Sequence, residues 1–202
     1  MSRRLLSLGG ELKDRRVLDL GCGRGETARL LRDEYDAAVT GVDLSEEFIN
    51  ECRGKWPDMT FICADAQDLP FRGGSFDIIV SECCFSVFAD PEKAFREAER
   101  VLSDGGILLL SDLWTEGRDS SGSGMVRCLY SRQRWLDMVT GAGFTVTGFH
   151  DVRSVLTGMY VQMILDLGRE GAQKQMGLCM THEEMKALSY MMLSAVKNRG
   201  TL

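Results

Sequence analysis

The first residues with chemical potential form a glycine-rich turn directly after an apolar run. Asp19 ends that run, and Gly21, Gly23 and Gly25 follow at alternate positions. Glycine adopts positive φ freely and lets a ligand approach the backbone closely. Glu26 stands where the pattern of dinucleotide-binding turns would need its last glycine, and a carboxylate is unfavourable beside a pyrophosphate. The turn therefore favours a cationic ligand, the alternative being an ordinary tight turn.

Two further carboxylates end the next two apolar runs. Asp43 follows Gly25 by 18 residues, where a carboxylate can accept hydrogen bonds from ribose hydroxyls. Asp65 can accept from the exocyclic amine of adenine, while the backbone N–H of Ala66 serves a ring nitrogen. Taken singly, Asp43 is also explained as a charge at a helix start, and Asp65 as a turn residue. As an ordered set they predict a nucleoside-binding edge.

This ordered set resembles the class I S-adenosylmethionine-dependent methyltransferases. Residues 19–25 resemble the glycine-rich motif, 41–45 the acidic ribose loop and 64–71 the adenine loop, while 76–82 and 102–112 resemble the fourth and fifth strands. The resemblance covers residues 16–112 and is nearest to small-molecule members of the group that includes quinone-biosynthesis enzymes. It implies S-adenosylmethionine as cofactor and a seven-stranded sheet whose antiparallel last strand inserts beside the fifth. The candidate cofactor residues are Asp19, Gly21, Cys22, Gly23, Gly25, Asp43, Leu44, Asp65, Ala66 and Glu82.

The methyl acceptor is expected beside residues 82–85, Glu-Cys-Cys-Phe. Cys83 and Cys84 there could be nucleophiles or soft ligands for a metalloid substrate. We favour apolar packing residues, because no base or cation flanks them. His150 and His182 are the two histidines available as near-neutral bases. No catalytic residue is assigned, and His150 and Cys83 are the candidates.

The apolar periodicity places these residues on an α/β framework. Short apolar runs alternate with amphipathic stretches, which predicts a doubly wound, mostly parallel, Rossmann-like sheet. Residues 103–106, Ser-Asp-Gly-Gly, are expected to form a turn before the fifth strand, and 115–124 a mobile loop. The predicted strands are 16–21, 38–44, 59–65, 76–82, 106–114 and 144–150. The predicted helices are 26–35, 45–56, 91–102 and one that begins at 132 and ends at Gly141 or Gly143.

A helical insertion is predicted before the last strand. Apolar residues recur at helical spacing from 155 to 167, Thr181 and Glu184 form a capping-box pattern, and the strand is expected to begin near Ser189. We therefore expect one domain over residues 1–202, with 151–188 as a lid over the cofactor edge. Met159, Tyr160 and Met163 share a helical face that could close on an apolar acceptor. Because little chain precedes the first strand, residues 1–8 are expected to be dispensable.

Composition narrows the possible partners. The net charge of −6 and the absence of a Lys/Arg block disfavour binding to nucleic acid. Seven cysteines at irregular spacing, with no CxxC pair, are expected to be free thiols, so neither disulfides nor a metal site are predicted. We expect a cytoplasmic protein without a membrane span, and the sequence leaves its oligomeric state open.

Three functions follow from these observations. The leading hypothesis is S-adenosylmethionine-dependent methyl transfer to a small molecule, whose identity and methylated atom the sequence leaves open. The alternative is a catalytically inactive S-adenosylmethionine-binding regulatory or partner subunit. A nicotinamide-dependent oxidoreductase comes third, because Asp19 and the glycine spacing disfavour it.

Overall fold

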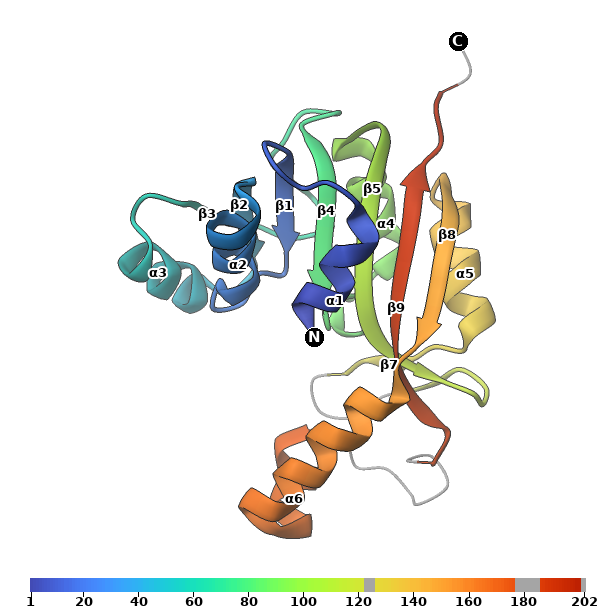
Figure 1. The fold of residues 1–202 in the computed structure, drawn as a ribbon. Coiled ribbons are helices and arrows are strands. Elements are labelled where there is room, and N and C mark those ends of the chain that lie inside the picture. The colour runs from blue at the N-terminus through green and yellow to red at the C-terminus, as the bar shows by residue number, and fades with distance from the viewer. Residues whose placement is uncertain (122–125, 177–185, 201–202) are drawn as a thin grey trace.

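A seven-stranded sheet with helices on both faces forms the centre of the molecule (Figure 1). The computed structural model describes residues 1–121, 126–176 and 186–200. The strands of the sheet are β1 (Arg16–Leu20), β2 (Ala38–Asp43), β3 (Thr60–Cys63), β4 (Phe76–Glu82), β5 (Leu102–Thr115), β8 (Phe144–Asp151) and β9 (Leu188–Lys197). Their order is β3-β2-β1-β4-β5-β9-β8, and β9 runs antiparallel to both of its neighbours. The predicted fold class and the insertion of the last strand beside the fifth are confirmed.

The helices begin where local chemistry satisfies their first N–H groups. The Ser45 hydroxyl accepts a hydrogen bond from the Phe48 N–H, and the Asp90 carboxylate accepts one from the Lys93 N–H. Pro91 occupies the first turn of the helix that Asp90 caps, where its missing N–H costs nothing. The helices are α1 (Ser2–Leu6), η1 (Ser7–Gly9), α2 (Glu26–Tyr35), α3 (Glu46–Lys55), η2 (Phe85–Val87), α4 (Pro91–Val101), α5 (Arg132–Gly141) and α6 (Arg153–Met176).

The two faces of the sheet bury separate hydrophobic clusters. On the side of α4 and α5, Phe95 stacks on Phe85 with 4.1 Å between ring centroids and meets Trp135 edge-on. On the side of α1 and α2, the fully buried Leu5 and Leu6 belong to the cluster that contains Val80. Both clusters anchor the central strands, whose C-terminal ends carry the predicted site.

The burial of α1 corrects the expectation that residues 1–8 are dispensable. Leu5 and Leu6 each have 0% of their surface exposed. Arg3 pairs with Glu34 of α2, which ties α1 to the rest of the domain. Sequence reasoning missed this role because a single short turn of helix carries no periodic signal. Removing the segment would uncover apolar surface on the sheet.

Two boundaries differ from the sequence prediction. The expected turn at 103–106 lies inside β5, with Gly105 at φ +74° and a register shift against β4. The short strands β6 (Ser120–Ser121) and β7 (Cys128–Leu129) pair where a loop was expected. The helix expected to end at Gly168 does break there: this glycine has φ +71° and ψ +170°, and a second helical segment follows within α6. Thr181, His182 and Glu184 lie outside the described residues.

Helix α6 extends beyond the end of the sheet where the parallel strands terminate (Figure 1). It begins just after β8, and the Val152 N–H donates a hydrogen bond to the Tyr190 carbonyl at 2.7 Å. Met159 and Leu165 are exposed, at 53% and 73%, whereas Tyr160 and Met163 are half-buried. Within the described part of the chain, every helix is too short or too polar to cross a membrane.

Candidate active site

A cavity of about 340 Å³ opens at the C-terminal ends of β1, β2 and β3. It gathers five of the residues predicted to bind the cofactor, although they are separated by up to 45 positions in the chain. Its lining is Leu20, Gly21, Val42, Asp43, Leu44, Ala64, Asp65, Ala66, Gln67, Cys84, Val87, Phe88, Ala89 and Arg127. The sheet topology produces this convergence, because parallel strands end at one edge.

The glycine turn between β1 and α2 requires its glycines for different reasons. Gly21, Gly23 and Gly25 have φ values of +74°, +51° and +75°. A Cβ atom on Gly21 would lie 2.2 Å from the Sγ of Cys84, whereas one on Gly23 would meet nothing within 4 Å. Gly21 is therefore fixed by packing and φ together, while Gly23 leaves open space beside the cavity.

Asp19 lies beneath this turn with 3% of its surface exposed. Its Oδ2 atom is buried and has no hydrogen-bond partner within the described residues. Burial, together with the negative charges of Glu82 and Asp43, raises the pKa of Asp19 to about 7, and a backbone hydrogen bond from Ala28 opposes this. An unpartnered buried carboxylate is costly, so the site is built for a donor or cation that the protein itself does not supply.

Asp43 joins two loops of the site. Its Oδ2 accepts from the Gly23 N–H at 2.8 Å, and its Oδ1 accepts from the Ser45 N–H at 2.9 Å. Each carboxylate oxygen has a second lone pair, so both remain able to accept from a ligand hydroxyl. Asp43 thus fixes the position of the glycine turn relative to the start of α3, and it also faces the cavity.

Asp65 is positioned by a neighbour that sequence reasoning did not single out. Its Oδ1 accepts from the Gln67 N–H at 2.8 Å and from the Gln67 Nε2 at 3.0 Å. These hydrogen bonds lower the pKa of Asp65, so the carboxylate is ionised. Gln67 Oε1 in turn accepts from the Asp90 N–H at 2.8 Å, which connects the adenine candidate to the start of α4.

The remaining cofactor candidates occupy three different environments. Glu82 is half-buried and accepts from the Thr27 hydroxyl at 2.8 Å. Leu44 is 70% exposed at the rim of the cavity. Cys22 is 8% exposed and packs in a small cluster with Ala28, so its side chain supports the glycine turn from behind.

The two adjacent cysteines after β4 have different roles. Cys84 lines the cavity and packs its Sγ 3.4 Å from the Gly21 carbonyl, as a packing residue would. Cys83 is exposed and has φ +58°, which a non-glycine residue adopts only when its surroundings impose it. Desolvation by the surrounding protein atoms and the negative charge of Asp112 nevertheless raise the pKa of Cys83 to about 12. The packing interpretation therefore describes Cys84 but not Cys83.

Tyr190 and Ser111 are site residues that the sequence analysis missed. The Tyr190 hydroxyl lies 2.8 Å from the Cys83 Sγ and 3.0 Å from the Ser111 Oγ. Tyr190 comes from β9 and Ser111 from β5, so the contact depends on β9 being inserted beside β5. Both residues stood in apolar runs without a recognisable motif, and their sequence offered no signal of this role.

The candidate base His150 is separated from these residues. It is exposed on the edge strand β8, and both β9 and β5 lie between β8 and β4. Neighbouring strands are about 4.8 Å apart, so three spacings put β8 about 14 Å from β4. His150 reaches the same edge of the sheet as Cys83, because the pairs His150–Met192, Met192–Ser111 and Ser111–Glu82 lie in one row, but it is displaced sideways by these three strand spacings. His182 lies outside the described residues.

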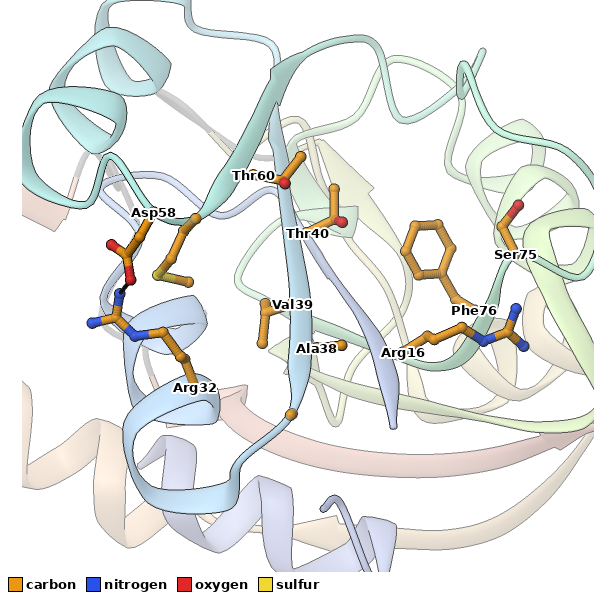
Figure 2. Close-up of a pocket in the computed structure, with 11 residues that line it drawn as sticks. Arg16, Arg32, Ala38, Val39, Thr40, Asp58, Thr60, Ser75 and Phe76 are labelled. Carbon is orange, nitrogen blue, oxygen red and sulfur yellow. Dashed lines mark hydrogen bonds and ion pairs between the residues drawn. The ribbon is translucent and has the colours of Figure 1, made fainter. Parts of the chain in front are cut away.

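A larger hollow of about 480 Å³ lies at the opposite edge of the sheet (Figure 2). Its two arginines are already paired, Arg32 with Asp58 at 2.9 Å and Arg16 with Asp77 at 2.6 Å. It lies near the starts of the parallel strands, away from the carboxylates described above. Doubly wound sheets bind ligands at the other edge, so volume alone does not make it the active site.

The glycine turn, the acidic loops and β4–β5 also match known proteins. A family model described as "Methyltransferase domain" matches residues 18–110. The chain is 28% identical over 195 residues to the O-methyltransferase cnsE of Penicillium expansum, covering 89% of this chain and 71% of that protein. It is 41% identical over 96 residues to the malonyl-[acyl-carrier protein] O-methyltransferase of Geobacter sulfurreducens, covering 46% of this chain and 36% of that protein.

A solved structure has the same fold. The phosphoethanolamine N-methyltransferase 2 of Haemonchus contortus, in complex with S-adenosyl-L-methionine, aligns with a TM-score of 0.80 and 19% identity. The alignment covers 98% of this chain and 52% of that one. The likeness extends over the sheet and its helices, and therefore supports the architecture independently of the matched motifs.

Proposed function

We propose, because this chain belongs to the class I S-adenosylmethionine-dependent methyltransferases, that it transfers the methyl group of S-adenosylmethionine to a small molecule. The cavity at the ends of β1–β3 is the cofactor site of this proposal, and the neighbouring end of β4 is the acceptor side. The similarity to the demethylmenaquinone methyltransferase of Thermotoga maritima, 37% identical over 112 residues, supports a small acceptor.

The observation that carries the proposal is the unpartnered Oδ2 of Asp19. The ammonium group of the cofactor would supply the missing donor and positive charge. A dinucleotide would instead bring its pyrophosphate close to this carboxylate and to Glu26. The residues present therefore fit S-adenosylmethionine better than a nicotinamide cofactor.

The other predicted residues would each contact a different part of the cofactor. Asp43 would accept from the ribose hydroxyls with its remaining lone pairs, and Asp65 from the adenine amine, with Ala66 offering its backbone N–H. Gly23 leaves the space through which the methionine portion would reach Asp19. Glu82, held by Thr27, borders this region on the acceptor side.

When bound, the cofactor supplies an activated methyl carbon for an in-line displacement. The protein's contribution is then to hold the acceptor at attacking distance and to exclude water. Cys84 and Gly21 close the floor of the cavity, and Phe88 forms an apolar wall. An acceptor whose nucleophile is already acidic would need no further base.

We include in this proposal one domain over residues 1–202, with 151–188 acting as its cover. The start of α6 is fixed to β9 through Val152 and Tyr190, and its half-buried Tyr160 and Met163 would meet an apolar acceptor. A cytoplasmic location also belongs to the proposal. It is supported by the six cysteines that the structure describes, all of which are free thiols, whereas Cys179 lies outside those residues.

Calorimetry with S-adenosylhomocysteine, S-adenosylmethionine and NAD tests the cofactor. Both adenosyl ligands should bind saturably, NAD should not, and Asp19→Asn should weaken the adenosyl ligands specifically. Tight NAD binding without binding of either adenosyl ligand would overturn the proposal. A screen of small-molecule pools for S-adenosylhomocysteine release then tests catalysis against the inactive-subunit alternative.

A further inference from the structure

The end of β4 presents an exposed thiol whose position is fixed by two other strands. The Cys83 N–H donates to the Ser111 carbonyl at 2.8 Å, and the Cys83 Sγ contacts the Tyr190 hydroxyl at 2.8 Å. Tyr190 is 8% exposed and Ser111 is fully buried. Their hydroxyl groups therefore lie in the interior beside Cys83, which is held at positive φ. Non-glycine residues in this strained conformation cluster at functional sites, so Cys83 is a candidate functional residue.

The burial of Ser111 gives this hydrogen-bond chain a direction. If Cys83 donated to Tyr190 and Tyr190 to Ser111, the Ser111 proton would need a further acceptor. No other acceptor for that hydroxyl occurs within the described residues. In the opposite direction, Ser111 donates to Tyr190, Tyr190 donates to Cys83, and the S–H of the exposed Cys83 points outward. The second arrangement satisfies every buried donor.

We propose that Ser111 and Tyr190 are positioning residues that turn the Cys83 S–H outward, as a hydrogen-bond donor to a hydroxyl or carbonyl oxygen of an uncharged methyl acceptor. The inference rests on the proposed function, because it takes the end of β4 as the acceptor side. Cys84, the next residue, lines the cofactor cavity, so an acceptor that contacts Cys83 lies beside the cofactor. The carboxylates of Glu82 and the buried Asp112 disfavour an anionic acceptor here.

The thiol is a donor in this arrangement and not a nucleophile or base. Desolvation keeps its pKa near 12, and burial also raises the pKa of Tyr190, so both groups retain their protons at neutral pH. The methyl group therefore passes to the acceptor and not to sulfur. Tyr190 also ties this contact to the start of α6, because its carbonyl accepts from the Val152 N–H.

Iodoacetamide labelling of the chain of residues 1–202, followed by peptide mass spectrometry, tests the positioning without requiring turnover. The reagent attacks the thiolate, which the Tyr190 hydroxyl stabilises by a hydrogen bond. Tyr190→Phe should therefore slow labelling of Cys83 by about tenfold at constant pH. Cys63 is an internal control, since it is exposed and its Sγ donates to the Leu44 carbonyl, away from Tyr190, so its rate should not change.

Measuring turnover and cofactor binding separately distinguishes a failure of the proposed function from a failure of the inference about Cys83. A panel of neutral phenols, enolisable diketones and carboxylic acids is screened for S-adenosylhomocysteine release. Phenols or diketones should be preferred, Tyr190→Phe and Cys83→Ala should lower kcat by similar factors without additivity, and Cys83→Ser should recover part of the loss. Tyr35→Phe, on α2, is the matched tyrosine control.

The outcomes are distinct. If the wild-type protein does not bind S-adenosylhomocysteine, the proposed function itself is overturned. If S-adenosylhomocysteine binds but Cys83 is labelled at the same rate or faster in Tyr190→Phe, only this inference is overturned. A preference for carboxylic acids as acceptors that Cys83→Ala leaves unchanged would also overturn it. If no member of the panel is methylated, the labelling rate alone decides whether Tyr190 positions the thiol.

Discussion

The carboxylate of Asp43 accepts a hydrogen bond from the backbone N–H of Gly23, with 2.8 Å between the nitrogen and Oδ2. The contact joins the end of β2 to the turn after β1, so one residue both shapes the cavity at the ends of β1–β3 and faces it. The other oxygen of Asp43 accepts a hydrogen bond from the Ser45 N–H, so the same carboxylate also positions the start of α3.

Asp43→Ala should weaken binding of S-adenosylhomocysteine by about 1.5–3 kcal/mol, the range for hydrogen bonds to a charged group. It should also reduce the free energy of unfolding, because two backbone N–H groups lose their partner. Calorimetry measures the first effect and urea unfolding the second. Asp43→Asn is the control that keeps the shape of the side chain. Its free energy of unfolding should fall less than that of Asp43→Ala, while its affinity for S-adenosylhomocysteine should still be weaker than that of the wild type. Unchanged cofactor affinity in Asp43→Ala would mean that the residue serves the loops alone.

Gly21→Ala should destabilise the fold more than Gly23→Ala. Both place a Cβ on a residue with positive φ, which costs about 1–2 kcal/mol. Only the Gly21 variant also collides with Cys84, which should add about 1–3 kcal/mol. Cys84→Ala removes the Sγ at 2.2 Å, so combining it with Gly21→Ala should recover part of the loss. Additive effects in a denaturation cycle would contradict the clash.

The unliganded protein should lose stability as the pH rises from about 4 to 7. Asp19 has an ordinary pKa of 3.8 when unfolded and about 7 when folded, so the native state holds a proton that the unfolded state releases in this window. Asp112, raised to about 6 by burial, acts in the same direction. Urea unfolding at pH 5 and pH 8 should show a smaller decline for Asp19→Asn. An equal decline in both proteins would argue against a protonated Asp19.

Tyr160→Ala should lower kcat/KM for the acceptor while leaving S-adenosylhomocysteine affinity unchanged. The half-buried ring lies on α6, and one missing apolar contact is worth about 1–3 kcal/mol, or about 10–200-fold. Leu165→Ala, also on α6 but 73% exposed, is the control and should have little effect. Equal effects of the two substitutions, or none, would remove α6 from acceptor selection.

Leu5→Ala or Leu6→Ala should reduce the free energy of unfolding by about 2–5 kcal/mol, as expected for fully buried leucines. Deletion of residues 1–8 should cost at least as much. Arg4→Ala, an exposed change in the same helix, is the control. Thermal and urea denaturation measure the differences, and a deletion variant as stable as the intact chain would show that α1 is only loosely docked.

The sequence by itself determined the cofactor half of the molecule. The strands and helices from Arg16 to Val101 follow from local periodicity, caps and glycines, so their positions were predictable within one or two residues. Asp19, Asp43 and Asp65 could be selected because each lies within two residues of the end of a strand, and the ends of parallel strands meet at one edge. The position of the last strand required the family resemblance, because 189–197 alone fitted a helix or a strand.

The tertiary structure alone decided what surrounds Cys83 at the end of β4. Tyr190 reaches Cys83, 107 positions away in the chain, only because β9 enters the sheet antiparallel beside β5. The exclusion of His150 and the burial of Leu5 likewise depend on which strands become neighbours. Local periodicity reports whether a side chain faces the interior. It does not report which distant side chain it meets there, because that contact is set by the order and direction of strands in the assembled sheet.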